Sequence, residues 1–138
     1  MIYVLDASAL LRLLLNQPGA ARVEQILEGA DARTHRVLIA AVNWGEVVGQ
    51  IDRQHGRAAA HGLRKTMRHY GLQIVPSSSA RAEQAALLKR DWRIGYADAF
   101  CIQLAIEQSP ATLVTADFDF APLQHHHSVE FLPQQPAV

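Results

Sequence analysis

The chain has 138 residues, 49% of them hydrophobic, and its formal net charge at pH 7 is zero. Such a chain can bury one hydrophobic core and is typical of a single domain. No stretch approaches the roughly 20 apolar residues that cross a bilayer, and the N-terminus lacks a signal-peptide pattern. The single cysteine, Cys101, excludes an internal disulfide and a multi-cysteine zinc site. We therefore expect a cytoplasmic protein.

The charges are unevenly placed along the chain. Residues 51–70 contain five arginines and lysines but only one acid, Asp52. After Arg93 the chain has no lysine or arginine, whereas five of its acids lie there. A basic region can attract phosphate and an acidic one can hold a cation. Charge alone nevertheless favours ordinary solvated surface in both places.

Short apolar runs of β-favouring residues alternate with segments whose apolar residues recur at helical spacing. The expected elements, in chain order, are strand 2–5, helices 9–16 and 20–28, strand 36–42, helices 43–55 and 57–70, strand 72–75, helices 80–90 and 96–107, and strands 111–114 and 128–132. Asp6 or Ser8 is the expected N-cap of the first helix. Gly56 and Gly71 are expected to end helices. Residues 1–132 would form the domain, and residues 133–138 a flexible tail.

This alternation predicts a parallel sheet of four or five strands with helices on both faces. In such α/β sheets, ligands bind outside the carboxyl ends of the strands. If strands 2–5 and 111–114 are central neighbours, Asp6 and Asp117 meet at this edge.

Four acids are expected near this edge. Asp6 and Asp117 follow strands, and Glu46 and Asp98 lie in the first turns of helices. Any one of them is explained by helix capping or by the helix dipole. Four together raise one another's pKa unless a cation offsets their charge. Mg²⁺ prefers oxygen ligands, and one or two such ions could activate water for phosphodiester hydrolysis.

The motifs around these acids resemble those of the PIN domain family. They are Asp6-Ala-Ser8 after the first strand, Glu46 opening a helix, Tyr-Ala-Asp98-Ala before an apolar helix, and Leu-Val-Thr115-Ala-Asp117-Phe-Asp119-Phe after a late strand. Their order and the chain length are most similar to the VapC-type toxins of bacterial toxin–antitoxin pairs. The resemblance covers residues 1–132.

This resemblance implies a three-layer α/β/α PIN-like fold and a Mg²⁺- or Mn²⁺-dependent endoribonuclease, held inactive by an antitoxin and often dimeric. The positions that match the family's metal-binding acids are Asp6, Glu46, Asp98 and Asp117. Ser8 would orient a carboxylate or a metal-bound water. Thr115 matches a family hydroxyl position, although it can equally be a hydrogen-bonding residue at a strand end. Asp119 is expected to support its loop rather than to bind metal.

A basic stripe could bind the substrate. Its members, at spacing near four, are Arg53, Arg57, His61, Lys65 and Arg68. They share one helix face only if Gly56 does not break the helix. We hypothesise that the arginines and Lys65 contact an RNA backbone, so that binding weakens with salt.

Two further features invite other chemistry. The run His125-His126-His127 is expected to be a polar loop, because consecutive side chains diverge too far to share one ion. Cys101 is expected to be a small core residue rather than a nucleophile, because it lies in the middle of an apolar helix.

Other classes of protein remain to be weighed. A noncatalytic PIN-like module that binds RNA or protein is the main alternative, and the four intact acids argue against it. An aspartate-nucleophile phosphatase would carry Asp-x-Asp where this chain has Asp6-Ala-Ser8. A phosphoacceptor receiver would carry a late lysine, but no lysine follows Lys89.

Overall fold

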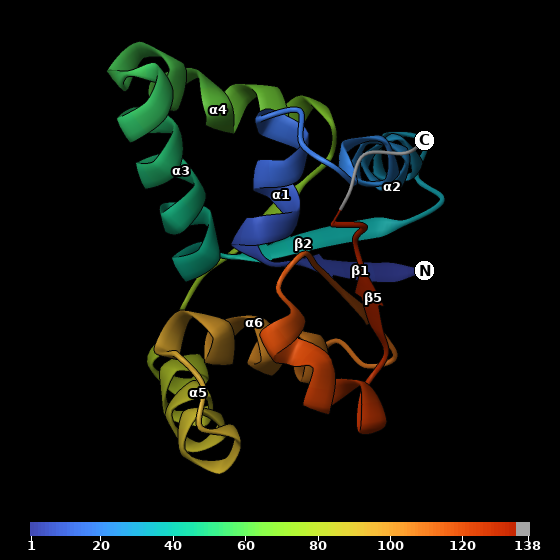
Figure 1. Cartoon of the computed structure of the whole chain (residues 1–138), viewed down its shortest axis with the longest axis vertical. Coiled ribbons are helices and arrows are strands. Elements are labelled where there is room, and N and C mark those ends of the chain that lie inside the picture. The colour runs from blue at the N-terminus through green and yellow to red at the C-terminus, as the bar shows by residue number, and fades with distance from the viewer. Residues whose placement is uncertain (135–138) are drawn as a thin grey trace.

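Strands and helices alternate along the computed structural model, which describes residues 1–134 (Figure 1). The strands are β1 (Ile2–Leu5), β2 (Arg36–Ala40), β3 (Gln73–Val75), β4 (Thr112–Thr115) and β5 (Val129–Phe131). The helices are α1 (Ala7–Leu14), α2 (Ala20–Asp31), α3 (Ala41–His55), α4 (Arg57–His69), α5 (Ser79–Trp92), α6 (Tyr96–Glu107) and the 3₁₀ helix η1 (Phe118–His125). None of the helices within these residues is long and apolar enough to cross a membrane.

The five strands form one parallel sheet in the order β3-β2-β1-β4-β5. The central strand β1 pairs with β2 on one side and with β4 on the other, so that Leu5 lies opposite both Ile39 and Val114. The first and fourth strands are therefore neighbours, which was the condition for Asp6 and Asp117 to meet. Because the carboxyl ends of β1 and β4 lie side by side, the residues that follow them meet at one edge.

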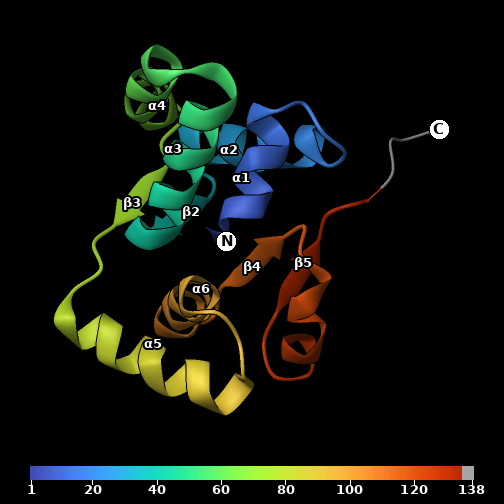
Figure 2. The same ribbon diagram turned by 60° about the vertical axis from the view of Figure 1, so that its left-hand side comes forward.

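A hydrophobic cluster covers each face of the sheet. Successive strand residues point to opposite faces, and β1 accordingly sends Tyr3 and Leu5 to one cluster and Val4 to the other. Helices α1 to α4 contribute to the first cluster, and α5, α6 and η1 to the second. Figure 2 shows the two groups of helices on opposite sides of the strands. The predicted three-layer α/β/α class is confirmed.

Several element boundaries differ from the sequence-based expectation. The strand expected at 36–42 ends at Ala40, because α3 begins at Ala41 and takes Val42 and Asn43 into its first turn. The first helix begins at Ala7, because the side chain of Asp6 caps it. The 3₁₀ helix η1 was not expected. Of the tail expected at 133–138, residues 135–138 lie outside the described part of the chain.

Candidate functional site at the carboxyl edge of the sheet

Asp6 is held at the junction of β1 and α1. Its carboxylate accepts hydrogen bonds from the backbone N–H of Ala9 at 2.8 Å, from the Ser8 hydroxyl at 2.7 Å and from the Thr115 hydroxyl. The residue is only 4% exposed. Burial raises the pKa of Asp6 from its ordinary value of 3.8 to about 6, although the three hydrogen bonds lower it and the charge of Asp98 adds to the rise.

Two hydroxyls join the loops that carry Asp6 and Asp117. The Ser8 hydroxyl, which donates to Asp6, also accepts the backbone N–H of Ala116 at 2.9 Å. Thr115 Oγ1, which also donates to Asp6, accepts the backbone N–H of Asp117 at 2.9 Å. These contacts fix the position of one acid-bearing loop relative to the other. They place Ser8 and Thr115 in direct contact with the first predicted acid.

Asp98 lies in the first turn of α6, as predicted, and is half-buried. Its pKa is raised from 3.8 to about 6, first by burial and then by the negative charges of Asp117, Glu46 and Asp119. The fold therefore brings the predicted acids of four separate segments within electrostatic reach of one another. Asp119, which was not expected to bind metal, contributes to the same negative field.

Asn43 is a site residue that sequence reasoning missed. It lies in the first turn of α3 and is 1% exposed. Its amide donates to Glu46 Oε1 at 3.2 Å and to the backbone carbonyl of Ala97 at 3.0 Å, beside Asp98. Because Glu46 Oε1 and the Ala97 carbonyl both accept hydrogen bonds, the amide nitrogen of Asn43 is the atom that faces them. The buried Asn43 Oδ1 has no hydrogen-bond partner within residues 1–134. The spacing of three between Asn43 and Glu46 was the signal available in the sequence.

The acids do not form a closed metal cage. Across residues 1–134, no group of three or more Asp, Glu, His or Cys side chains has the spacing of a ready-made metal site. The donor set nevertheless fits a hard divalent cation, because it consists of carboxylate oxygens whose mutual repulsion such a cation would relieve. Mg²⁺ in particular binds through one or two carboxylates and keeps several water ligands. Asp6, Glu46, Asp98 and Asp117 are thus the residues that could hold it.

The expected basic stripe is interrupted. Helix α3 ends at His55, and Gly56 adopts a φ of +91° between the two helices. Arg53, Arg57 and Lys65 are all exposed. Arg57 forms an ion pair with Asp52 at 2.8 Å. The four predicted RNA contacts therefore do not lie along one continuous helix.

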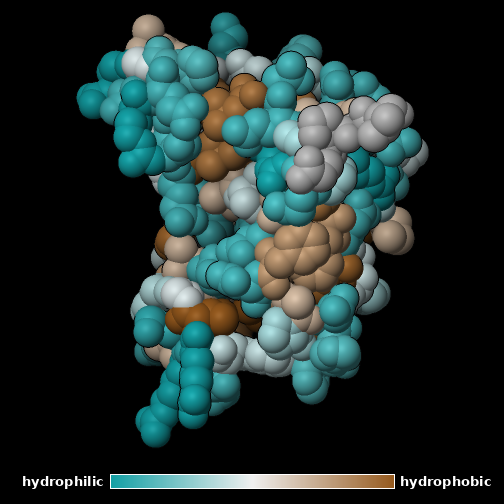
Figure 3. Space-filling model, in the orientation of Figure 1, coloured by the Kyte–Doolittle hydropathy of each residue, from teal (hydrophilic) through white to brown (hydrophobic). Residues whose placement is uncertain are grey.

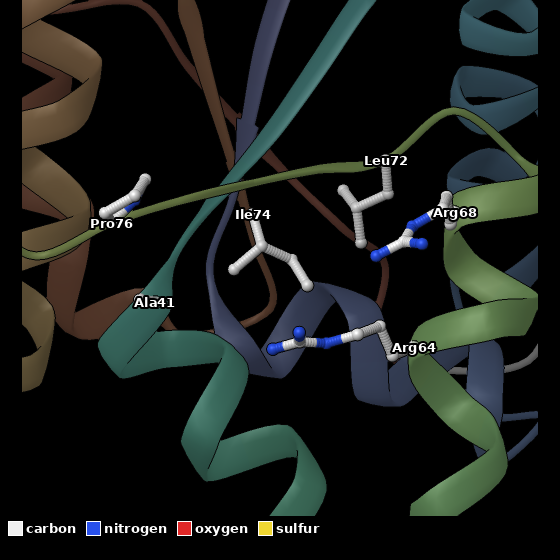
Figure 4. Close-up of a pocket in the computed structure, with 6 residues that line it drawn as sticks. All are labelled: Ala41, Arg64, Arg68, Leu72, Ile74 and Pro76. Atoms are coloured by element: carbon white, nitrogen blue, oxygen red, sulfur yellow. The ribbon is translucent and has the colours of Figure 1, made fainter.

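Arg68 instead lies with Arg64, one turn earlier on α4, over a cavity of about 420 Å³. Its lining residues are Ala41, Arg64, Arg68, Leu72, Ile74 and Pro76. Figure 4 shows both arginine side chains extending from α4 toward Leu72 and Ile74. No acid lines the cavity, and within residues 1–134 neither guanidinium forms an ion pair or a hydrogen bond. The result is a concentrated positive charge close to where β2 and β3 end.

Cys101 and the histidine run 125–127 have structural roles. Cys101 is fully buried in the cluster beneath α5 and α6, where burial raises the pKa of its thiol, so the predicted core position is confirmed. His125 closes η1, and His126 packs edge-on against Trp92 with ring centres 5.1 Å apart. Burial lowers the pKa of His127.

The fold and this site define a class: an α/β/α protein whose acids gather at the carboxyl edge of a parallel sheet. The family model described as PIN domain matches residues 3–125. The chain therefore belongs to the PIN domain family.

Solved structures give the same fold. The VapBC2 structure from Rickettsia felis, bound to a promoter DNA fragment, matches with a TM-score of 0.70 and 18% identity over 96% of this chain and 100% of that one. A toxin–antitoxin complex from Klebsiella pneumoniae matches at 0.67 and 21% over 98% and 99%. VapC20 from Mycobacterium tuberculosis, described as a toxin that cleaves the sarcin–ricin loop, matches at 0.67 and 15% over 99% and 100%. No curated protein matches the chain in sequence.

Proposed function

We propose that this chain is a Mg²⁺- or Mn²⁺-dependent endoribonuclease, the toxin of a toxin–antitoxin pair. The observation that carries the proposal is that the acids lie close enough to raise the pKa of Asp98. The pKa of Asp98 rises to about 6 partly because Asp117, Glu46 and Asp119 are close. Carboxylates held this close repel one another, and a divalent cation is the simplest compensation for their charge.

The four acids would hold the metal. A bound divalent cation supplies a more acidic water and stabilises the charge that develops on phosphate. Asp6 is held by three hydrogen bonds, so that its carboxylate keeps one orientation. Asn43 holds Glu46 against the first turn of α6. The hydroxyls of Ser8 and Thr115 both donate to Asp6 and so help to orient its carboxylate.

RNA as the substrate is supported by the positive charge over the cavity beside the ends of β2 and β3. Arg64 and Arg68 present two guanidinium groups free of protein partners within residues 1–134, which suit phosphate because each can donate two parallel hydrogen bonds. This revises the set of predicted contacts in favour of Arg68 with Arg64, and leaves Arg53, Arg57 and Lys65 as peripheral contacts. The similarity in fold to a toxin described as cleaving the sarcin–ricin loop supports the same substrate class.

The partners follow from the same similarities. Two of the matched structures are described as VapBC or toxin–antitoxin assemblies, which supports a cognate antitoxin that holds this chain inactive in the cytoplasm. We also propose that the toxin is a homodimer, as the PIN resemblance implies. Light scattering of the purified chain, alone and with the product of a neighbouring small gene, tests both assemblies.

The decisive experiment incubates the purified chain with a mixed pool of structured cellular RNAs. Mg²⁺ or Mn²⁺ should give cleavage, and a chelator should stop it. The variants Asp6→Asn and Asp98→Asn, shown to be folded by circular dichroism, should be inactive. Absence of metal binding and of cleavage in protein free of any inhibitor would instead favour the noncatalytic interaction module.

A further inference from the structure

Phe118 is exposed directly beside the acidic site. It follows Asp117, it is the first residue of η1, and its side chain is 51% exposed. Its ring stacks on Phe131 of β5, with ring centres 4.9 Å apart and the two planes within 6° of parallel. Because Phe131 covers one face of the ring, this exposure means that the opposite face is open to solvent.

Core packing does not account for this aromatic ring. Phe120, two residues later, is 3% exposed and belongs to the cluster beneath α6, to which Phe131 also packs. Phe118 belongs to neither cluster. Figure 3 shows apolar side chains gathered on the surface where Figure 1 places β5 and the start of η1, with hydrophilic side chains beside them. Folding thus gains little from the outer face of Phe118, which is available to a ligand.

We propose that the open face of Phe118 is a stacking platform for an unpaired nucleobase of the RNA, next to the phosphodiester that is cut. This inference rests on the proposed ribonuclease function and adds to it a preference for the substrate's structure. The platform lies one residue from Asp117, so a base stacked there belongs to a nucleotide close to the acids.

The pair of phenyl rings is well suited to this role. Phe131 fixes the plane of the Phe118 ring from behind, so that stacking does not require the ring to be ordered at the moment of binding. A base that lies on Phe118 cannot remain stacked within a duplex, so the enzyme would cut at loops, bulges or single strands. Purines offer the larger surface and should be preferred at this position. Stacking of one base on an aromatic side chain changes affinity about 5- to 150-fold.

The test uses a short single-stranded RNA whose cleavage position has been mapped with the active protein. The fluorescent base 2-aminopurine, whose emission falls when it stacks, is placed in turn at each position around the cut. Binding is measured with the full chain carrying Asp98→Asn, so that the RNA stays intact. Phe118→Leu removes the aromatic face and keeps an apolar side chain, and Phe118→Trp keeps an aromatic face. Leu87→Ala, at a 61% exposed position on α5, is the matched control.

We expect quenching at one position beside the cut both with the original Phe118 and with Phe118→Trp. The quenching should disappear with Phe118→Leu, together with an affinity about 5- to 150-fold weaker. In the active background, Phe118→Leu should raise KM by a similar factor and leave kcat and the melting temperature unchanged. Leu87→Ala should behave like the parent protein.

Unchanged quenching and KM in Phe118→Leu would overturn the platform. So would a variant that alters only self-association or antitoxin binding, because Phe118 would then belong to a protein interface. Failure of the parent protein to cleave any RNA would count against the ribonuclease itself. The two failures are distinct, because a parent protein that cleaves the RNA but is unaffected by Phe118→Leu overturns the platform alone.

Discussion

Thr115, the last residue of β4, donates its side-chain hydroxyl to the buried carboxylate of Asp6, which follows β1. The two residues are far apart in the sequence and meet because β1 and β4 pair in parallel. The same hydroxyl accepts the backbone N–H of Asp117. One oxygen atom thereby orients the first acid of the site and fixes the loop that carries the last.

Replacing Thr115 by valine should therefore affect both stability and the pH dependence of activity. Valine has nearly the same shape but leaves Asp6 Oδ2 without its donor and the N–H of Asp117 without an acceptor, which costs about 1–3 kcal/mol. Loss of a hydrogen bond to the charged carboxylate should raise the pKa of Asp6 further, so that the acid limb of kcat/KM moves to higher pH. Urea unfolding and a pH–rate profile measure the two effects. Thr115→Ser should restore both, and a normal profile in Thr115→Val would disprove the coupling.

The next prediction concerns the stability of the metal-free protein. The pKa of Asp6 is about 6 in the folded chain, against an ordinary value of 3.8. The folded state thus binds this proton more tightly than the unfolded state, and stability falls as pH rises from about 4 to above 6. Asp6→Asn removes the buried charge, and the asparagine oxygen can still accept from Ser8 and Ala9. The variant should be inactive and yet, at pH 7.5 in chelator, more stable than the parent by up to about 3 kcal/mol.

Urea unfolding at pH 4 and pH 7.5 checks this sign. The advantage of Asp6→Asn should disappear at pH 4, where the parent carboxyl is largely protonated in the folded state. Mg²⁺ or Mn²⁺ should stabilise the parent more than the variant, since binding to the folded state adds stability. An equal pH dependence in the two proteins would mean that burial of Asp6 carries no such cost.

Much of this site could be predicted from the sequence. Asp6 and Asp117 follow short apolar strands, and the rule that parallel strands end at one edge places them together. The bounds of α6 were predicted residue for residue, because Gly95 and Pro110 limit a long apolar segment. Asp98 lies in the first turn of α6 as predicted. The same prediction was wrong for Glu46, which lies in the second turn of α3 because that helix begins at Ala41.

The remaining features depend on contacts between distant segments. Nothing local to Asn43 reveals that its amide reaches Ala97 across the gap between α3 and α6. The 3₁₀ helix η1 was missed because its apolar residues do not recur at α-helical spacing and it contains Pro122. The pairing of Arg57 with Asp52 likewise depends on the chain reversal at Gly56, which helical spacing alone does not give.

Asn43 should act as a positioning residue for Glu46. Asn43→Leu keeps the approximate volume but removes both donated hydrogen bonds, to Glu46 and to the Ala97 carbonyl. Residues that orient metal ligands typically contribute roughly 10- to 100-fold to metal affinity, and we expect a loss of this size for Mn²⁺, measured by calorimetric titration. Gln54→Leu, at an exposed position near the end of the same helix, controls for the loss of an amide. Destabilisation without weaker Mn²⁺ binding would reduce Asn43 to a purely structural role.

The last prediction concerns the two arginines over the cavity beside α4. Replacing both Arg64 and Arg68 by glutamine should weaken RNA binding and leave kcat unchanged, because these residues lie apart from the acids. The dependence of log K on log salt should become shallower by roughly 0.7 for each phosphate of a single strand that the protein no longer neutralises. Fluorescence anisotropy measures this slope. The titration runs between about 50 and 200 mM salt, where affinity that depends on phosphate contacts changes strongly.

A change of net charge alone could also weaken RNA binding, so the control must remove the same charge elsewhere. The double variant Lys89→Gln and Arg90→Gln does so at the exposed end of α5. Its salt slope should stay close to that of the parent protein. Arg64→Lys with Arg68→Lys retains the charge but loses the paired hydrogen bonds to phosphate, and should recover the slope only in part. Equal slopes for the two charge-removing doubles would show that the cavity binds no particular phosphate and that only the overall field attracts RNA.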